Sequence, residues 1–193
     1  MNYLKKICIL PVSALLLASC SGAESPGYET SFCYWKTTIT FSPSEREMWK
    51  QSGGKIDVFA DFVGTGGTFG GYAGYLKMAN PNIRCYAVEP YGMGFYKDEI
   101  IEGTRHGIQG GGYAKEMPNS EKSFVDGAIT VTDEEAVEMT HLLAKMEGIF
   151  AGFSSGANLA AAIKLLQNEE TGKNIGIVIN DCGLKYMSTT LWT

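Results

Sequence analysis

The chain has 193 residues, 45% of them hydrophobic and 19% charged, which is long enough for one well-buried domain and short for two. Its formal net charge of -5 and its pI near 5.1 provide no basic surface for binding nucleic acid. The five cysteines are scattered and form no CxxC pair, so we expect neither a disulfide framework nor a metal site.

Residues 1–27 form an apolar leader with two interpretations. Two lysines precede the apolar run at residues 7–18, and Leu17-Ala18-Ser19-Cys20 resembles a bacterial lipoprotein cleavage box with Cys20 as the lipidated residue. The run is too short for an ordinary transmembrane span. A remnant helix buried in the domain explains the same composition, so the sequence leaves a signal-like segment and a buried helix both open.

Residues 28–54 are predicted to be an irregular connection that contains one short helix. Ser44 is followed three residues later by Glu47 and then by apolar residues, which is typical of a capping box at a helix start. Gly53-Gly54 ends this helix. The main domain is then predicted to span residues 55–193.

That domain begins with a strand at residues 56–63, a helix at residues 69–78 and a second strand at residues 83–88. Such a crossover joins parallel strands, so the GTGGT loop at residues 64–68 falls between the end of a strand and the start of a helix. Backbone N–H groups and the helix dipole favour an anion there. The loop lacks the lysine of a P-loop and the spacing of a dinucleotide fingerprint, which favours a small phosphate monoester. A tight strand-to-helix turn is the alternative explanation.

A long glycine-rich connection follows, up to residue 119, and His106 within it is expected to make a local hydrogen bond. Further along, the pattern predicts strands at residues 128–131, 149–153 and 174–180. Thr132 caps a helix that ends near Glu147, and residues 157–167 form another helix after a Ser154-Ser155-Gly156 turn. The alternation predicts an α/β fold with a mostly parallel sheet of about four strands and helices on both faces. Ligands of such sheets bind at the carboxyl ends of the strands, where GTGGT and Ser154 both lie.

Four motifs carry a family resemblance, in the order GTGGT, HGIQGGG, GIFAGFSSGANLAAA and DCGLKYMSTTLW. At these intervals they resemble the cysteine synthase and cystathionine β-synthase family of pyridoxal phosphate enzymes, over roughly residues 45–192. The resemblance implies a three-layer α/β domain that is an incomplete version of the large domain of fold type II enzymes.

The resemblance also implies a cofactor site for pyridoxal 5′-phosphate. The first serine of the SSG motif would hydrogen-bond the pyridine nitrogen, and because a hydroxyl leaves that nitrogen unprotonated, the cofactor suits β-elimination and β-replacement on an O-activated serine, as in cysteine biosynthesis. The residues implied for the phosphate are Gly64, Thr65, Gly66, Gly67 and Thr68, and the residue implied for the pyridine nitrogen is Ser154.

The sequence departs from the family at its amino-terminal half, where the Schiff-base lysine and the substrate-binding asparagine loop have no match. Lys185 lies in the closing motif and does not correspond to that lysine. We therefore expect pyridoxal phosphate to bind without a covalent link, assign no catalytic residue, and expect no turnover by this chain alone.

Three interpretations stay open: an enzyme-derived pseudoenzyme, a subunit completed by a lysine-bearing partner chain, and a non-catalytic surface lipoprotein. The expected partners are the amino-acid substrate of the parent family and a second copy or partner chain, with membrane contact only if Cys20 is lipidated. The resemblance implies a cytoplasmic location, and the lipoprotein interpretation implies a membrane-anchored one.

Overall fold

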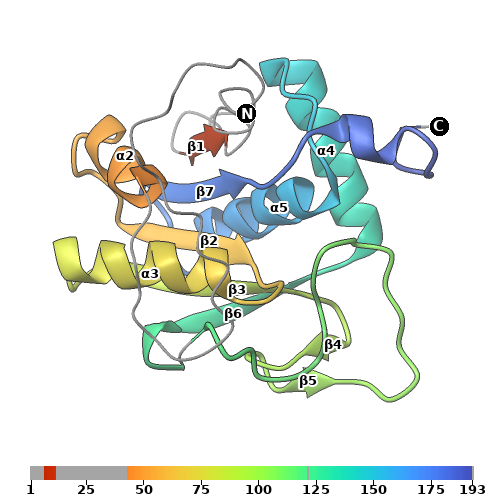
Figure 1. Ribbon diagram of the computed structural model, residues 1–193, viewed down its shortest axis with the longest axis horizontal. Coiled ribbons are helices and arrows are strands. Elements are labelled where there is room, and N and C mark those ends of the chain that lie inside the picture. The colour runs from red at the N-terminus through yellow and green to blue at the C-terminus, as the bar shows by residue number, and fades with distance from the viewer. Residues whose placement is uncertain (1–6, 12–42, 121, 193) are drawn as a thin grey trace, which may run out of the picture.

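The computed structural model describes residues 7–11, 43–120 and 122–192, and it is built around one parallel sheet. Five strands lie in the order β1-β7-β2-β3-β6, and all of their pairings are parallel (Figure 1). The mostly parallel sheet predicted from the sequence is confirmed. Its strands are β1 (Ile7–Pro11), β2 (Val58–Phe62), β3 (Arg84–Pro90), β6 (Gly127–Val131) and β7 (Ile175–Ile179).

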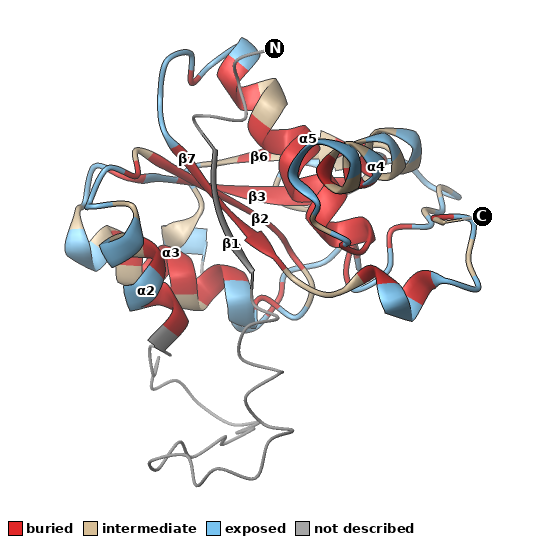
Figure 2. Ribbon diagram, turned by 90° about the horizontal axis from the view of Figure 1, so that it is seen from above, coloured by how far each residue is buried: buried red, intermediate tan, exposed pale blue. Residues whose placement is uncertain are grey.

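Two pairs of helices cover the two faces of this sheet (Figure 2). On one face lie α2 (Pro43–Gln51) and α3 (Gly67–Ala79), and on the other α4 (Asp133–Glu147) and α5 (Phe153–Gln167). Alternate residues of β2 point to opposite faces, so Phe59 packs in the core beneath α3 and Val58 in the core beneath α5. The three-layer arrangement is thus confirmed.

The smaller elements lie outside these layers. The connection after β3 contains a short antiparallel ribbon of β4 (Met93–Gly94) and β5 (Glu99–Ile100). Two 3₁₀ helices follow later in the chain, η2 (Lys122–Phe124) and η3 (Gly183–Tyr186). The rest of the long connection is irregular, as predicted.

Of the first 42 residues, the structure describes residues 7–11, which form β1 and pair with β7 in parallel register. These five residues are therefore a strand, not the helix that one interpretation of the leader allowed. The rest of residues 1–27, including Cys20, and residues 28–42 lie outside the described residues, so the leader and lipoprotein hypotheses stay predictions. Within the described ranges, no helix has the length and apolar character needed to cross a membrane.

Two local predictions differ from the structure. Residues 149–153 do not form a strand, because Gly148 ends α4 in a left-handed conformation and Gly152 already caps α5, which leaves only an isolated bridge between Ala151 and Cys182. The apolar residues that suggested a strand are instead buried at a helix start. At the other helix, α2 begins at Pro43, so Ser44 lies inside it rather than capping it.

Candidate functional site

The GTGGT loop connects β2 to α3 and requires glycine at two close approaches. Gly66, the N-cap of α3, has a φ of 83°, and a Cβ atom there would lie 2.7 Å from the Ser120 backbone nitrogen. A Cβ atom at Gly64 would lie 2.4 Å from the Gly110 carbonyl oxygen. The loop therefore lies close against the 110–120 segment. The first N–H groups of α3, which have no intrahelical partner, stay available to an anion.

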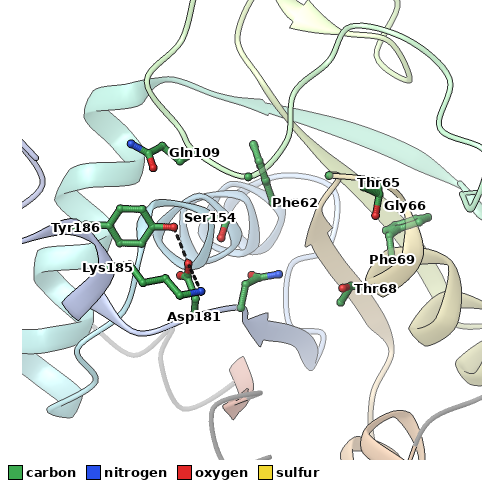
Figure 3. Close-up of a pocket in the computed structure, with 14 residues that line it drawn as sticks. Phe62, Thr65, Gly66, Thr68, Phe69, Gln109, Ser154, Asp181, Lys185 and Tyr186 are labelled. Carbon is green, nitrogen blue, oxygen red and sulfur yellow. Dashed lines mark hydrogen bonds and ion pairs between the residues drawn. The ribbon is translucent and has the colours of Figure 1, made fainter. Parts of the chain in front are cut away.

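Ser154 lies at the same carboxyl edge of the sheet, across a cavity from the GTGGT loop. It is the second residue of α5, after the N-cap Gly152, and it is 7% exposed. Between Ser154 and the GTGGT loop lies a cavity of about 240 Å³. Figure 3 shows Thr65 and Thr68 on one side of this cavity and Ser154 on the other. The cavity is lined by Phe62, Gly64, Thr65, Gly66, Gly67, Thr68, Phe69, Gln109, Gly110, Ser154, Asn180, Asp181, Lys185 and Tyr186.

All six residues that the sequence analysis assigned to a cofactor therefore line one cavity. Among the described residues, the hydroxyls of Thr65, Thr68 and Ser154 have no hydrogen-bond partner. Thr65 and Thr68 are exposed and Ser154 is buried, so the cavity offers three hydroxyls that can donate hydrogen bonds to a polar ligand. The glycine cradle, the α3 amino terminus and these hydroxyls suit a phosphate group.

A second group of polar side chains stands at the Ser154 side of the cavity and was not assigned from the sequence. The Tyr186 hydroxyl donates a hydrogen bond to Asp181 Oδ2 at 2.5 Å, and Lys185 Nζ lies 3.7 Å from the same oxygen. Burial and then this carboxylate contact raise the pKa of Tyr186, which stays a phenol. Asp181 Oδ1 is buried and has no partner in the described structure. The signal available in the sequence was the DCGLKY motif, which contains all three of these side chains.

A third group lies beneath the cavity and was also missed. Asp61 on β2 is completely buried and accepts a hydrogen bond from Asn158 Nδ2 at 2.9 Å, and Asn158 also contacts Asn180. Burial raises the pKa of Asp61 to about 7, although the hydrogen bonds from Asn158 and Asn180 act in the opposite direction. The available signal was a single acid within the apolar strand run FADFV.

The glycine-rich connection contributes Gln109 and Gly110 to the cavity, but not His106. A ring nitrogen of His106, Nε2, lies 3.2 Å from the Gly112 carbonyl oxygen, so the predicted local hydrogen bond is confirmed. In the described part of the chain, no cluster of three or more histidine, cysteine or acidic side chains is arranged to hold a metal ion.

Comparison with known proteins shows which family the chain resembles. The family described as "Pyridoxal-phosphate dependent enzyme" matches residues 43–183. A cysteine synthase of Dictyostelium discoideum is 36% identical over 162 residues, covering 77% of this chain and 43% of that protein. Cysteine synthase A of Escherichia coli K12 is 39% identical over 154 residues, covering 76% and 47%.

A solved structure of a related enzyme also resembles this chain in fold and sequence. The O-acetylserine dependent cystathionine beta-synthase from Helicobacter pylori matches with a TM-score of 0.69 and 34% identity, over 77% of this chain and 48% of that one. The chain thus spans about half the length of the curated relatives it matches. The GTGGT and SSG motifs both lie in the matched region. The family match and these similarities show that the chain belongs to the pyridoxal-phosphate dependent enzymes, in the cysteine synthase and cystathionine β-synthase family.

Proposed function

We propose that this chain binds pyridoxal 5′-phosphate in the cavity between the GTGGT loop and Ser154. The observation that carries the proposal is the meeting of the α3 amino terminus and three hydroxyl-bearing residues, Thr65, Thr68 and Ser154, around one cavity. A phosphate at the loop and a pyridine ring toward α5 would satisfy both ends of the site.

The residues of the chain have separate tasks in this proposal. The backbone N–H groups at the start of α3, together with the Thr65 and Thr68 hydroxyls, hold the phosphate. The Ser154 hydroxyl donates a hydrogen bond to the pyridine nitrogen and, being neutral, leaves that nitrogen unprotonated. When bound, the cofactor supplies an electron sink for chemistry at the β-carbon of an amino acid, the class of reaction for which the relatives are named.

We further propose that the chain does not catalyse turnover by itself. None of its lysines corresponds to the Schiff-base lysine that the family resemblance implies, and a covalent nucleophile of this type is activated by its surroundings. The chain would then hold the cofactor through the phosphate and the ring alone, as a cysteine synthase-like pseudoenzyme.

Equilibrium dialysis of the purified chain against pyridoxal phosphate tests the binding proposal. We expect saturable binding that falls about tenfold in Thr68→Val and about fivefold in Ser154→Ala, since each removes one hydrogen bond, one of them to a charged group. Thr171→Val is the control, because its exposed hydroxyl donates to the Asn168 carbonyl and Thr171 does not line the cavity. Binding that is unsaturable, or equal in all four proteins, would refute the proposal.

A second candidate function is that of a subunit completed by a lysine-bearing chain. The specific observation is that η3, which borders the cavity with Lys185 and Tyr186, exposes apolar side chains beside them: Leu184 is 71% exposed and the adjoining Met187 is 53% exposed. Addition of the amino-terminal half of a relative such as Escherichia coli cysteine synthase A tests it. Formation of cysteine from O-acetylserine and sulfide only in the mixture supports this candidate; equal rates with and without this chain oppose it.

A further inference from the structure

A buried polar wedge separates two central strands just below the cavity. β2 pairs with β7 only from Val58 to Ala60, and the ladder stops before Asp61. Beyond that point the amide of Asn158, from α5, lies between the two strands. Its Nδ2 donates to Asp61 Oδ1 and to the Val178 carbonyl oxygen, each at 2.9 Å, so α5 supplies hydrogen bonds where the strand ladder ends.

Asn180 connects this wedge to the cavity. Its Oδ1 lies 3.1 Å from Asn158 Nδ2, and its own Nδ2 lies 3.4 Å from Asp61 Oδ1. Its backbone N–H donates to the Ser155 hydroxyl at 3.1 Å, next to Ser154 in the first turn of α5. Because Asn180 also lines the cavity, it touches the wedge and faces the ligand space at once.

Asp61 has no compensating cation among the described groups that act on it. From α5 it faces Asn158, after β7 it faces Asn180, and its own strand supplies the Phe62 backbone N–H. On α3, the Tyr72 phenol is close enough for the charge of Asp61 to raise its pKa, as the acids Glu45 and Glu47 of α2 also do. The cavity's Lys185 is paired with Asp181.

The second carboxylate oxygen of Asp61, Oδ2, accepts no hydrogen bond in the described structure. Asp61 Oδ2 and Asn158 Oδ1 are both buried and have no partner in the described structure. A carboxylate in this position is uncompensated, whereas a carboxylic acid has a proton to donate. The pKa of about 7 produced by burial places this change of state in the neutral range.

We infer that Asn180 contacts the ligand and that Asp61, acting through Asn158 and Asn180, is a positioning residue that links ligand binding to the uptake of one proton. This inference rests on the proposed function, since it takes the bound ligand to be a phosphate ester at the GTGGT loop. Neither residue belongs to the motifs from which the cofactor site was predicted.

The coupling follows from charge. Asp61 precedes Gly64 by three residues, which is a distance of about 10 Å along an extended strand. A bound phosphate therefore places negative charge near an ionised Asp61 in a poorly screened interior, so the anion binds better when Asp61 is neutral. For unit charges at this distance, the change in affinity is on the order of tenfold.

Sulfate is the probe for this effect, because the phosphate of pyridoxal phosphate titrates itself near about pH 6 while sulfate does not titrate in this range. Isothermal titration measures sulfate affinity and proton uptake, from pH 6 to pH 9 and in two buffers of different ionisation enthalpy. We expect the affinity to fall about tenfold over this range, with proton uptake near pH 8.

Asp61→Asn is the decisive variant, because it keeps the shape and the acceptor while removing the charge. We expect affinity that does not change with pH and no proton uptake. The matched control is Asp57→Asn, which removes a carboxylate just before β2 that instead holds Asn174. An unchanged pH slope in Asp61→Asn, or an equal loss of slope in Asp57→Asn, would overturn the coupling.

Asn180→Ala tests the ligand contact. We expect its affinity for pyridoxal phosphate at pH 6 to be about fivefold lower, the value of one hydrogen bond, with sulfate affinity unchanged because sulfate occupies only the loop. Equal pyridoxal phosphate affinity in the unchanged chain and in Asn180→Ala would show that Asn180 does not contact the ligand. If the unchanged chain binds neither pyridoxal phosphate nor sulfate, the proposed function fails as well; if it binds both and only the variants disagree, the failure is confined to this inference.

Discussion

Asp61 Oδ1 accepts a hydrogen bond from Asn158 Nδ2 at 2.9 Å, between residues 97 positions apart in the chain. The bond ties β2, which leads into the GTGGT loop, to α5, which carries Ser154 in its first turn. The two corners of the cavity are thus connected from below by a buried polar contact.

The buried charge of Asp61 makes the stability of the fold depend on pH. Its folded pKa of about 7 lies above the ordinary value of 3.8, so between these values the unfolded chain loses a proton that the folded chain keeps. The contribution of Asp61 to stability therefore falls as pH rises from about 4 to about 7 and then stays level. We expect Asp61→Asn to be more stable at pH 8, by at most about 4 kcal/mol, and equal at pH 4. Urea unfolding at the two pH values measures this; a constant difference would contradict it.

The crossing of α4 and α5 depends on a glycine. A Cβ atom at Gly156 would lie 2.0 Å from the Ala136 carbonyl oxygen and 2.1 Å from Thr140 Oγ1. Since the backbone carbonyl cannot turn away, we expect Gly156→Ala to cost about 3 kcal/mol of unfolding free energy. Gly67→Ala is the control, as its Cβ atom would meet nothing closer than Thr65 Oγ1 at 3.8 Å. Similar melting temperatures for the two variants would show that the crossing can relax.

The start of α4 is held by a capping box. The Thr132 hydroxyl accepts from the Glu135 backbone N–H at 3.2 Å, and the Glu135 carboxylate accepts from the Thr132 backbone N–H at 2.9 Å. Thr132→Ala removes the first bond and is expected to lower the unfolding free energy by about 1 kcal/mol. Thr132→Ser keeps the hydroxyl and should remain close to the original protein in chemical denaturation. A loss of the same size in the serine variant would assign the effect to packing of the methyl group.

The phosphate group should contribute most of the ligand's affinity. In the proposed binding mode, the α3 amino terminus and the Thr65 and Thr68 hydroxyls would contact only the phosphate. We expect pyridoxal, which lacks the phosphate, to bind at least about tenfold more weakly, since hydrogen bonds to a charged acceptor are the stronger ones. Competition dialysis with added inorganic phosphate measures the same contribution. Equal affinities for the two vitamers would move the binding site away from the loop.

Several features of the chain followed from local patterns. The alternation of strands and helices predicted the parallel sheet, and Thr132 with Glu135 marked the start of α4. The GTGGT and SSG motifs predicted two corners at one edge, because carboxyl ends of parallel strands share an edge. The prediction of a strand at residues 149–153 is wrong, since apolar composition alone does not distinguish a strand from a buried helix start.

What the sequence by itself determined is the order of the elements, the parallel sheet and the two corners of the site, because turn residues and hydrophobic periodicity act over a few neighbouring positions. Only the tertiary structure decided that Asn158 ends the β2–β7 ladder, that no cation of the described residues acts on Asp61, and that Asn180 lies between them and the cavity. The physical reason is that the burial and partners of a polar side chain depend on residues far away in the chain, and no local pattern records them.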